Sequence, residues 1–345
     1  MKKTFALAFS LFISLIGNAQ NTSSAGEYMD YFSVEYVQIQ QDMWDYARSV
    51  SHGRSARKVE KRRAELIQTV ENAYRKAKSA KPFNNDSRYK DSVTHYFELT
   101  GIVLREDYGK IVDLEEVAEQ SYDLMEAYML ARELASDKLN EAGKMVNREH
   151  RSFAEANNIT IIEGEDTELD KKMEITNKVY DHYNAVYLVF FKSFKQELYL
   201  LDAIQKNDVS AIEQNRNALL ETLKEGEKKL ATIEKYANDP AMVNATNELF
   251  AFYKDEANEG VKYSLNYLEK TENFNKIKTV FDAKKQKDRT QADVDEYNGA
   301  VNEMNLAVNE VNAASQANNK RRSSLIDNWN REAEKFTSRH VPKGK

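Results

Sequence analysis

The sequence contains no cysteine, three prolines and 11 glycines in 345 residues. The absence of cysteine excludes disulfides, thiolate zinc sites, iron–sulfur clusters and covalently attached c-type haem. Proline and glycine supply the turns of sheet-rich proteins and are common in disordered chains. Their scarcity therefore predicts an ordered, helical protein.

Long apolar runs are missing after the N-terminal residues. Residues 1–19 have a basic start, an apolar stretch from Phe5 to Ile16 and small residues up to Ala19. This is the layout of a secretory signal peptide, because the apolar stretch is too short to span a bilayer as a helix. An N-terminal membrane anchor is the alternative. We expect a protein exported to the periplasm or the outer cell surface, with no transmembrane span in the mature chain.

The common catalytic and nucleotide-binding motifs are absent as well. The chain has no phosphate-cradling glycine loop, no dinucleotide fingerprint and no Gly-x-Ser-x-Gly motif. Without residues 1–20, which hold two lysines and no acid, 48 basic and 56 acidic residues remain, a net charge of −8. An exported chain of this charge is a poor ligand for nucleic acid. We therefore expect a non-enzymatic protein with no cofactor and no nucleic-acid partner.

Apolar residues recur at alternating steps of three and four through most of the mature chain. Clear examples run from Phe32 to Val50, from Tyr183 to Phe194 and from Val294 to Val311. Such steps average 3.5 residues and place one apolar stripe along each helix. A repeat of seven favours nearly parallel packing of the helices. The pattern therefore predicts an all-α fold built from long amphipathic helices.

The two halves of the chain align with each other. The offset is 151 for the first helices and 153 through the second and third, where Arg63 falls on Arg216. In the fourth helices the offset is 172, and Phe153 falls on Leu325. Four helices that align in the same order favour an internal duplication. Chance alignment of amphipathic helices is the alternative.

The duplication predicts the domain organisation. We expect two tandem up-down four-helix bundle units, at 20–157 and 171–345, that form an elongated molecule. Residues 158–170 lack the helical period and contain four acids from Glu163 to Glu168, so they are expected to form an acidic linker. A continuous bundle that shares one long helix through the linker is the variant.

Breaks in the apolar period predict the turns. Asn207–Asp208 and Asn238–Asp239 are cap sequences, and Asp239 is expected to accept hydrogen bonds from amides of the next helix. Pro240 suits the first position of that helix. Thr290 and Asp293 have the spacing of a capping box.

One basic cluster is the candidate partner-binding site. Only Glu60 opposes its positive charge within the cluster. Its residues are Arg54, Arg57, Lys58, Lys61, Arg62 and Arg63. A positive patch on an acidic protein suits lipid headgroups, acidic glycans or an acidic partner. A solvated helix start is the alternative.

Two further features have both a functional and a structural interpretation. His95 and Glu98 share a helix face and are a weak candidate for a metal site, although the five histidines form no Glu-x-x-His motif. The aromatic series that includes Tyr183, Tyr187 and Phe190 either lines a ligand cavity or fills the core.

Three stretches resemble an uncharacterised family of exported, all-helical bacterial surface proteins. They are the signal peptide that ends in Gly-Asn-Ala-Gln, residues Tyr122 to Tyr128, and the Asn-x-x-x-Arg-Ser-Phe pattern at Asn147–Phe153. The resemblance implies a cell-envelope location and supplies no activity. We therefore expect an envelope scaffold or binding module with a protein or glycan partner. A periplasmic bundle that binds a small molecule or a metal is the alternative.

Overall fold

The fold is all-α, as the apolar period predicts. The computed structural model describes residues 25–51, 56–107, 118, 120–161 and 167–343. Within these ranges the elements are helices, and the β-pairing is a single isolated bridge between Phe83 and Asp86. The predicted signal peptide at 1–19 lies outside the described residues.

The chain divides into two compact units. Unit 1 comprises Met1–Asn184 and Lys335–Lys345, and unit 2 comprises Ala185–Glu334. The division therefore falls inside two long helices, α6 (Glu168–Gln205) and α10 (Gln291–His340). Residues 168–170 of the predicted linker belong to α6.

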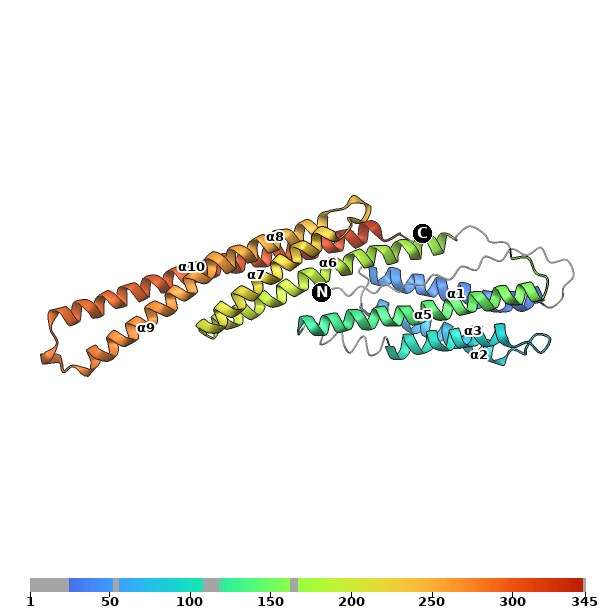
Figure 1. Cartoon of the computed structure of the whole chain (residues 1–345), viewed down its shortest axis with the longest axis horizontal. Helices are drawn as coiled ribbons and strands as arrows, with labels where there is room; N and C mark the ends of the chain where they lie inside the picture. The colour runs from blue at the N-terminus through green and yellow to red at the C-terminus, as the bar shows by residue number, and fades with distance from the viewer. Residues whose placement is uncertain (1–24, 52–55, 108–117, 119, 162–166, 344–345) are drawn as a thin grey trace. The chain divides into compact units, whose positions relative to one another are not determined.

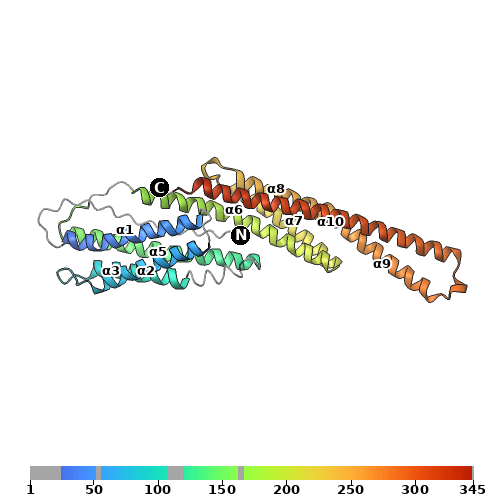
Figure 2. The same cartoon turned by 180° about the vertical axis from the view of Figure 1, so that it is seen from behind.

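Four helices and one short π-helical segment form most of unit 1. They are α1 (Ala25–Ser51), α2 (Ala56–Ser79), α3 (Arg88–Ile102), the π segment η1 (Val103–Asp107) and α5 (Tyr122–Ala156). Helix α1 packs on α2, α2 packs on α3, and α3 packs on α5, as Figures 1 and 2 show from opposite sides. The start of α6 and the end of α10 complete the unit.

Aromatic side chains fill the core of unit 1. Phe32, Tyr89 and Tyr96 are fully buried, and Tyr36 is nearly so. Their rings meet edge-on or tilted, with centroids 5.5 Å apart for Phe32 and Tyr89 and 5.3 Å apart for Tyr36 and Tyr96. Aromatic pairs in these arrangements add to the stability that burial supplies.

Unit 2 is built from five α-helices and three short helical segments, of which α6 and α10 extend into unit 1. They are α6 (Glu168–Gln205), α7 (Val209–Thr232), the short η2 (Tyr236–Asn238), α8 (Ala241–Asp255), the π segment η3 (Glu256–Gly260), α9 (Val261–Ala283), the short η4 (Gln286–Asp288) and α10 (Gln291–His340). Helix α7 contacts α8, η3 and α9. Its Gly226 permits a close approach, because a Cβ there would lie 2.7 Å from the ring of Phe250.

The predicted acceptors at the helix starts of unit 2 are confirmed, but Pro240 is the N-cap of α8 and not its first helical residue, because α8 begins at Ala241. Asp239 Oδ1 accepts a hydrogen bond from the amide of Ala241 at 3.0 Å, and Asp208, the N-cap of α7, accepts one from the amide of Ala211 at 3.0 Å. The capping box is reciprocal, because Thr290 N donates to Asp293 and Asp293 N donates to Thr290 Oγ1. These bonds satisfy amides that a helix start leaves without partners.

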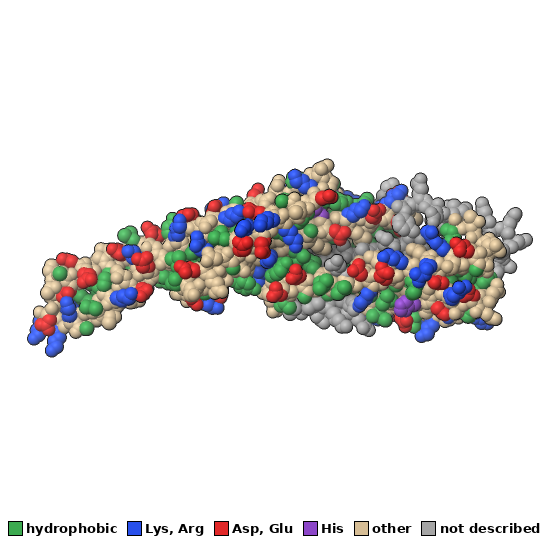
Figure 3. Space-filling model, in the orientation of Figure 1, with side chains coloured by type: hydrophobic (Ala, Val, Ile, Leu, Met, Phe, Trp, Pro, Cys, Tyr) green, Lys and Arg blue, Asp and Glu red, His purple; other side chains and the backbone are tan. Residues whose placement is uncertain are grey.

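Helix α9 and the first half of α10 form a solvated hairpin. Phe281 stacks on Tyr297 with centroids 4.6 Å apart, and Lys270 pairs with Glu303 at 2.9 Å. Most residues of both segments are exposed or half-buried. Acidic and basic side chains intermingle on the face drawn in Figure 3.

Hydropathy sets one further limit on the described helices. None of them joins sufficient length with sufficient apolar character to cross a membrane.

Candidate functional site: a surface hollow and a buried charge cluster

The structure places the predicted basic cluster at the start of α2 and divides it. Arg54 lies outside the described residues, and Arg57 lies in α2 with its side chain outside them. Lys58 is exposed. Lys61 and Arg62 line a hollow between α1 and α2 with a volume of about 590 Å³. The other residues that line it are Asp42, Ala64, Glu65, Gln68 and Thr69.

Acidic side chains balance the positive charge at this hollow. Arg62 Nη1 lies 2.9 Å from Glu65 and 3.8 Å from Asp45, and Lys61 Nζ lies 3.5 Å from Glu65. Asp42 accepts a hydrogen bond of 2.6 Å from Thr69 Oγ1. The sequence places only Glu60 within the cluster, but helix packing brings Asp42 and Asp45 from α1 to the same place. The hollow therefore carries charge of both signs.

Arg63 makes a structural contact that the amino-acid sequence alone does not reveal. Its guanidinium donates to the carbonyl oxygen of Leu104 in η1 at 3.4 Å. In unit 2, Arg216 donates to the carbonyl of Ala257 in η3 at 2.6 Å. A π-helical turn leaves the regular hydrogen-bond pattern of an α-helix, and each arginine satisfies a carbonyl there. Arg63 therefore stabilises the fold of unit 1.

His95 and Glu98 lie on the surface of α3. Both are exposed, and Glu98 accepts a hydrogen bond from Tyr74 at 3.1 Å. Across the described ranges, no group of three or more His, Cys, Asp or Glu side chains is placed to hold a metal ion.

The aromatic series of α6 packs into the core. Tyr187 and Phe190 are each 4% exposed, and Phe190 stacks on Trp329 of α10 with centroids 4.1 Å apart. Trp329 donates its indole hydrogen bond to Thr246 at 2.9 Å. The structural interpretation of Tyr187 and Phe190 is therefore the better one.

A buried charge cluster in unit 2 was not predicted. Arg322 of α10 donates through Nε to Glu197 of α6, and through Nη2 to Glu256 of η3 at 2.5 Å. A third bond joins Arg322 to Asn319. Glu197 is 0% exposed, Glu256 5% and Arg322 9%, so all three charges lie in the core. We call Glu197, Glu256 and Arg322 the buried triad.

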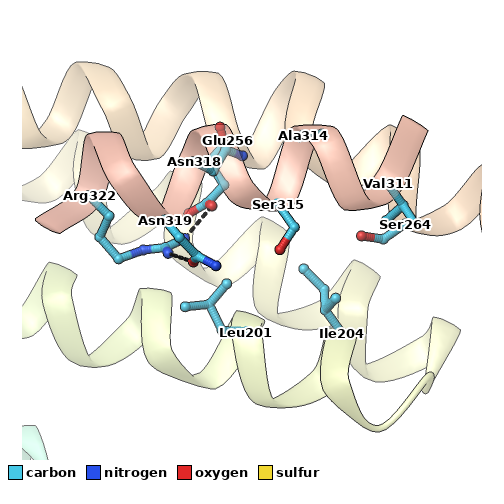
Figure 4. A pocket seen from close by; sticks show the side chains of 11 residues that line it. Leu201, Ile204, Glu256, Ser264, Val311, Ala314, Ser315, Asn318, Asn319 and Arg322 are labelled. Atoms are coloured by element: carbon cyan, nitrogen blue, oxygen red, sulfur yellow. Dashed lines mark hydrogen bonds and ion pairs between the residues drawn. The ribbon is translucent and has the colours of Figure 1, made fainter. Parts of the chain in front are cut away.

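A small cavity with both polar and apolar lining adjoins the buried triad. Its volume is about 50 Å³, which is room for a few water molecules. Glu256, Arg322, Ser315 and Asn318 are among its lining residues, as Figure 4 shows. Gly260 opens this space, because a Cβ there would lie 2.8 Å from Asn318 Nδ2.

Three polar atoms at the buried triad have no hydrogen-bond partner. They are Oε2 of Glu197, Oε2 of Glu256 and the hydroxyl of Tyr253. Burial raises the pKa of Glu197 to about 8; the charge of Arg322 opposes the shift and the charge of Glu256 adds to it. Burial also raises the pKa of Tyr253 well above its ordinary value. The triad therefore has a carboxyl charge that no cation neutralises and polar atoms that form no hydrogen bond.

Two sequence features point to the buried triad in retrospect. Glu197 interrupts an otherwise apolar stripe between Phe190 and Leu200, where a core position is expected. Gly260 lies in a segment without a turn signal, and it ends η3. Neither feature identifies Arg322, because Arg322 lies 125 residues from Glu197.

Comparisons with family models, with curated proteins and with solved structures found no match to this chain.

Proposed function

We propose that the protein is a non-enzymatic helical binding module of the cell envelope. In this proposal the hollow between α1 and α2 contacts a protein or glycan partner. The envelope location rests on the signal-peptide layout of residues 1–19 and on the resemblance to exported surface proteins.

The lining of the hollow is the observation that carries the proposal. The hollow is an open surface depression of about 590 Å³ and not an enclosed pocket that would bury a small ligand. It offers cationic, anionic, amide and hydroxyl groups from Lys61, Glu65, Gln68 and Thr69, and no aromatic ring. This chemistry suits a polar partner better than an apolar small molecule. The cavity at the buried triad, about 50 Å³, is too small for a metabolite.

We also infer that the two units share one four-helix ancestor. The offset of 153 relates η1 to η3, Arg63 to Arg216, and Leu104 to Ala257. In both units the arginine reaches the second residue of the π segment. Irregular features that recur at one offset support duplication more strongly than a shared apolar period does.

The loops before α3 and α8 match at the same offset. Asn85 and Asn238 have positive φ angles of 64° and 59°. Asp86 and Asp239 each accept a hydrogen bond of 3.0 Å from the amide two residues later. Left-handed backbone is uncommon outside glycine, so its recurrence here is informative.

The fourth helices align differently from the predicted offset of 172. In unit 1, Phe153 packs against Tyr89, which corresponds to Met242. In unit 2, Trp329 of α10 donates a hydrogen bond to Thr246 of α8. Because these two helices run antiparallel, Leu325 lies near residue 250 of α8 and not near Met242. The register of α10 is therefore displaced by about two turns from the predicted match.

The test of the proposed function reverses charge at the hollow. We expect the double variant Lys61→Glu, Arg62→Glu to lose binding to a partner captured from envelope extracts or on a glycan array. Both residues are exposed, so the variant should fold. Its matched control is Lys144→Glu, Arg148→Glu on α5, where both cations are also exposed and paired with acids.

Two outcomes would contradict the proposal. Equal binding by both double variants would show that the hollow is not the contact surface. A chain that resists added protease on intact cells, and is released with the cytoplasmic contents, would contradict the envelope location.

A further inference from the structure

The buried triad is built for a ligand that supplies positive charge and a hydrogen-bond donor. Two carboxyl groups face one guanidinium, so the fully ionised cluster has one uncompensated negative charge. Each carboxyl group has one oxygen bonded to Arg322 and one, Oε2, with no partner. An unpaired buried charge is costly, and so is an unpaired buried acceptor.

The surrounding groups leave the negative charge of the triad uncompensated. From α8, Tyr253 faces Glu197 and is a neutral phenol. From α7, Arg216 reaches the π segment but bonds Ala257 and Asn258. Arg321 of α10 pairs with Asp255 at 3.0 Å in an exposed position.

A single proton supplies both the positive charge and the hydrogen-bond donor that the triad lacks. On Oε2 of one glutamate, it neutralises the excess charge and allows that oxygen to donate to the other carboxylate. A metal cation would have to lie beside the guanidinium of Arg322, which repels it. Water in the adjoining cavity would supply donors but no charge, and it would give protons a route from solvent.

We propose that Glu197 and Glu256, held together by Arg322, form a binding site for one proton that maintains the folded state of unit 2. Loss of the proton leaves a net negative charge among buried helices, at the point where η3 joins α8 to α9. The high pKa of Glu197, about 8, is in accord with this arrangement.

Unit 1 indicates that the fold does not require these charges. Tyr46 corresponds to Glu197 at the offset of 151, and Val103 corresponds to Glu256 at 153. Both are buried in unit 1, at 3% and 0% exposed. Buried ion pairs are often no more stabilising than apolar side chains of similar size. The triad is therefore an addition to unit 2 and responds to pH.

The sign of the pH response follows from linkage. The unfolded chain loses the proton of Glu197 near pH 4.5, whereas the folded chain keeps it until about pH 8. Between these values the folded state binds more protons, so the stability of unit 2 falls as pH rises. Below pH 4.5 the full contribution is present, and above about pH 8 it is lost.

Each unit contains one tryptophan, which allows a direct test. Trp44 lies in unit 1, and Trp329 lies in unit 2 on Phe190. In a Trp44→Phe background, urea unfolding followed by Trp329 emission reports the loss of packing around Trp329 in unit 2. We expect the urea midpoint to fall steadily between pH 5 and pH 8. Glu197→Gln should flatten this profile, because the amide supplies the donor that the proton provides.

The control variant is Glu225→Gln, an exposed glutamate of α7 that pairs with Lys192. It should keep the wild-type profile. An equal slope in the Glu197→Gln variant, or a flat wild-type profile, would overturn the proposal. A shift in midpoint when KCl replaces choline chloride at constant ionic strength and pH 8 would also overturn it, because a metal cation would then be the ligand.

A second measurement does not depend on the folding of any variant. The ¹³Cδ signals of labelled glutamate in the wild-type chain should include one carboxyl that titrates near pH 8. Titration of every glutamate near pH 4–5 would contradict the shared proton.

Discussion

The two π segments occupy matching positions but differ in what surrounds them. Both follow a 15-residue helix, and both receive a hydrogen bond from an arginine of the helix before that one, Arg63 of α2 for η1 and Arg216 of α7 for η3. Beside η1, the buried positions are Val103 and Leu104, both apolar. In η3, the first residue is the buried Glu256, which accepts a hydrogen bond from Arg322.

This difference separates what both units share from what is particular to unit 2. An arginine bond to a π-helical carbonyl is present in both units, so it belongs to the architecture. The buried triad is present in unit 2, where apolar residues would serve for packing. In unit 1 the matching core positions do not hold this charge cluster. Charged residues at such a position in unit 2 are therefore candidates for a function other than stability.

The largest expected effect breaks the buried triad. Arg322→Leu leaves two buried carboxyl groups without a cation, and we expect unit 2 to lose about 3–5 kcal/mol of unfolding free energy at pH 7. Urea unfolding in the Trp44→Phe background measures it. Arg321→Leu is the adjacent control; its ion pair with Asp255 is exposed, and its loss should cost less than about 1 kcal/mol. Similar losses in the two variants would refute the difference between buried and exposed arginines.

The second effect concerns the opposite pH response of unit 1. Burial lowers the pKa of His150 to about 4, and the charge of Arg151 adds to the shift. The unfolded chain takes up this proton near pH 6.5, so unit 1 loses stability as pH falls from 6.5 to 4, by about 3 kcal/mol at most. His150 lies against the ring of Tyr89, with centroids 5.5 Å apart, so His150→Phe should fold and reduce this loss.

Trp44 emission in a Trp329→Phe background measures the response of unit 1. His95→Gln is the control, because that histidine is exposed. An acid response that is identical in the His150→Phe and wild-type chains would contradict the role of His150. Together with the buried triad, this test asks whether the two units weaken at opposite ends of the pH range.

The smallest expected effect tests the shared architecture. Arg63→Ala and Arg216→Ala each remove a charged donor from a π-helical carbonyl, at a cost of about 1.5–3 kcal/mol. The loss should be larger for Arg216, whose bond is 2.6 Å long and which also contacts Asn258. Unit-specific tryptophan emission measures both. A loss in only one unit would show that the two contacts are not equivalent.

Local sequence signals predicted the helices and several of their ends. The steps of three and four identified apolar stripes, because burial of one helix face needs that period. The caps at Asp239 and Thr290 were predictable, because a cap involves residues a few positions apart. The π segments were not predicted, because an extra residue within a helical turn leaves no consistent change in the apolar period.

The candidate site was predicted only in part. Lys61 and Arg62 were identified from a run of charge along the sequence. Their neutralisation by Asp45 was not, because that acid belongs to another helix. Arg63 was grouped with them, although its side chain turns to the carbonyl of Leu104.

The sequence by itself determined an all-α chain of amphipathic helices and several of the positions where they begin, and it predicted the offset of 153 at which the two π segments align. These features depend on residues close to one another or on a simple period. Only the tertiary structure decided that Glu197, Glu256 and Arg322 meet, across separations of 66 and 125 residues. The physical reason is that burial turns ordinary charged residues into a coupled site. Burial depends on which helix faces pack together, and the apolar period leaves that choice open.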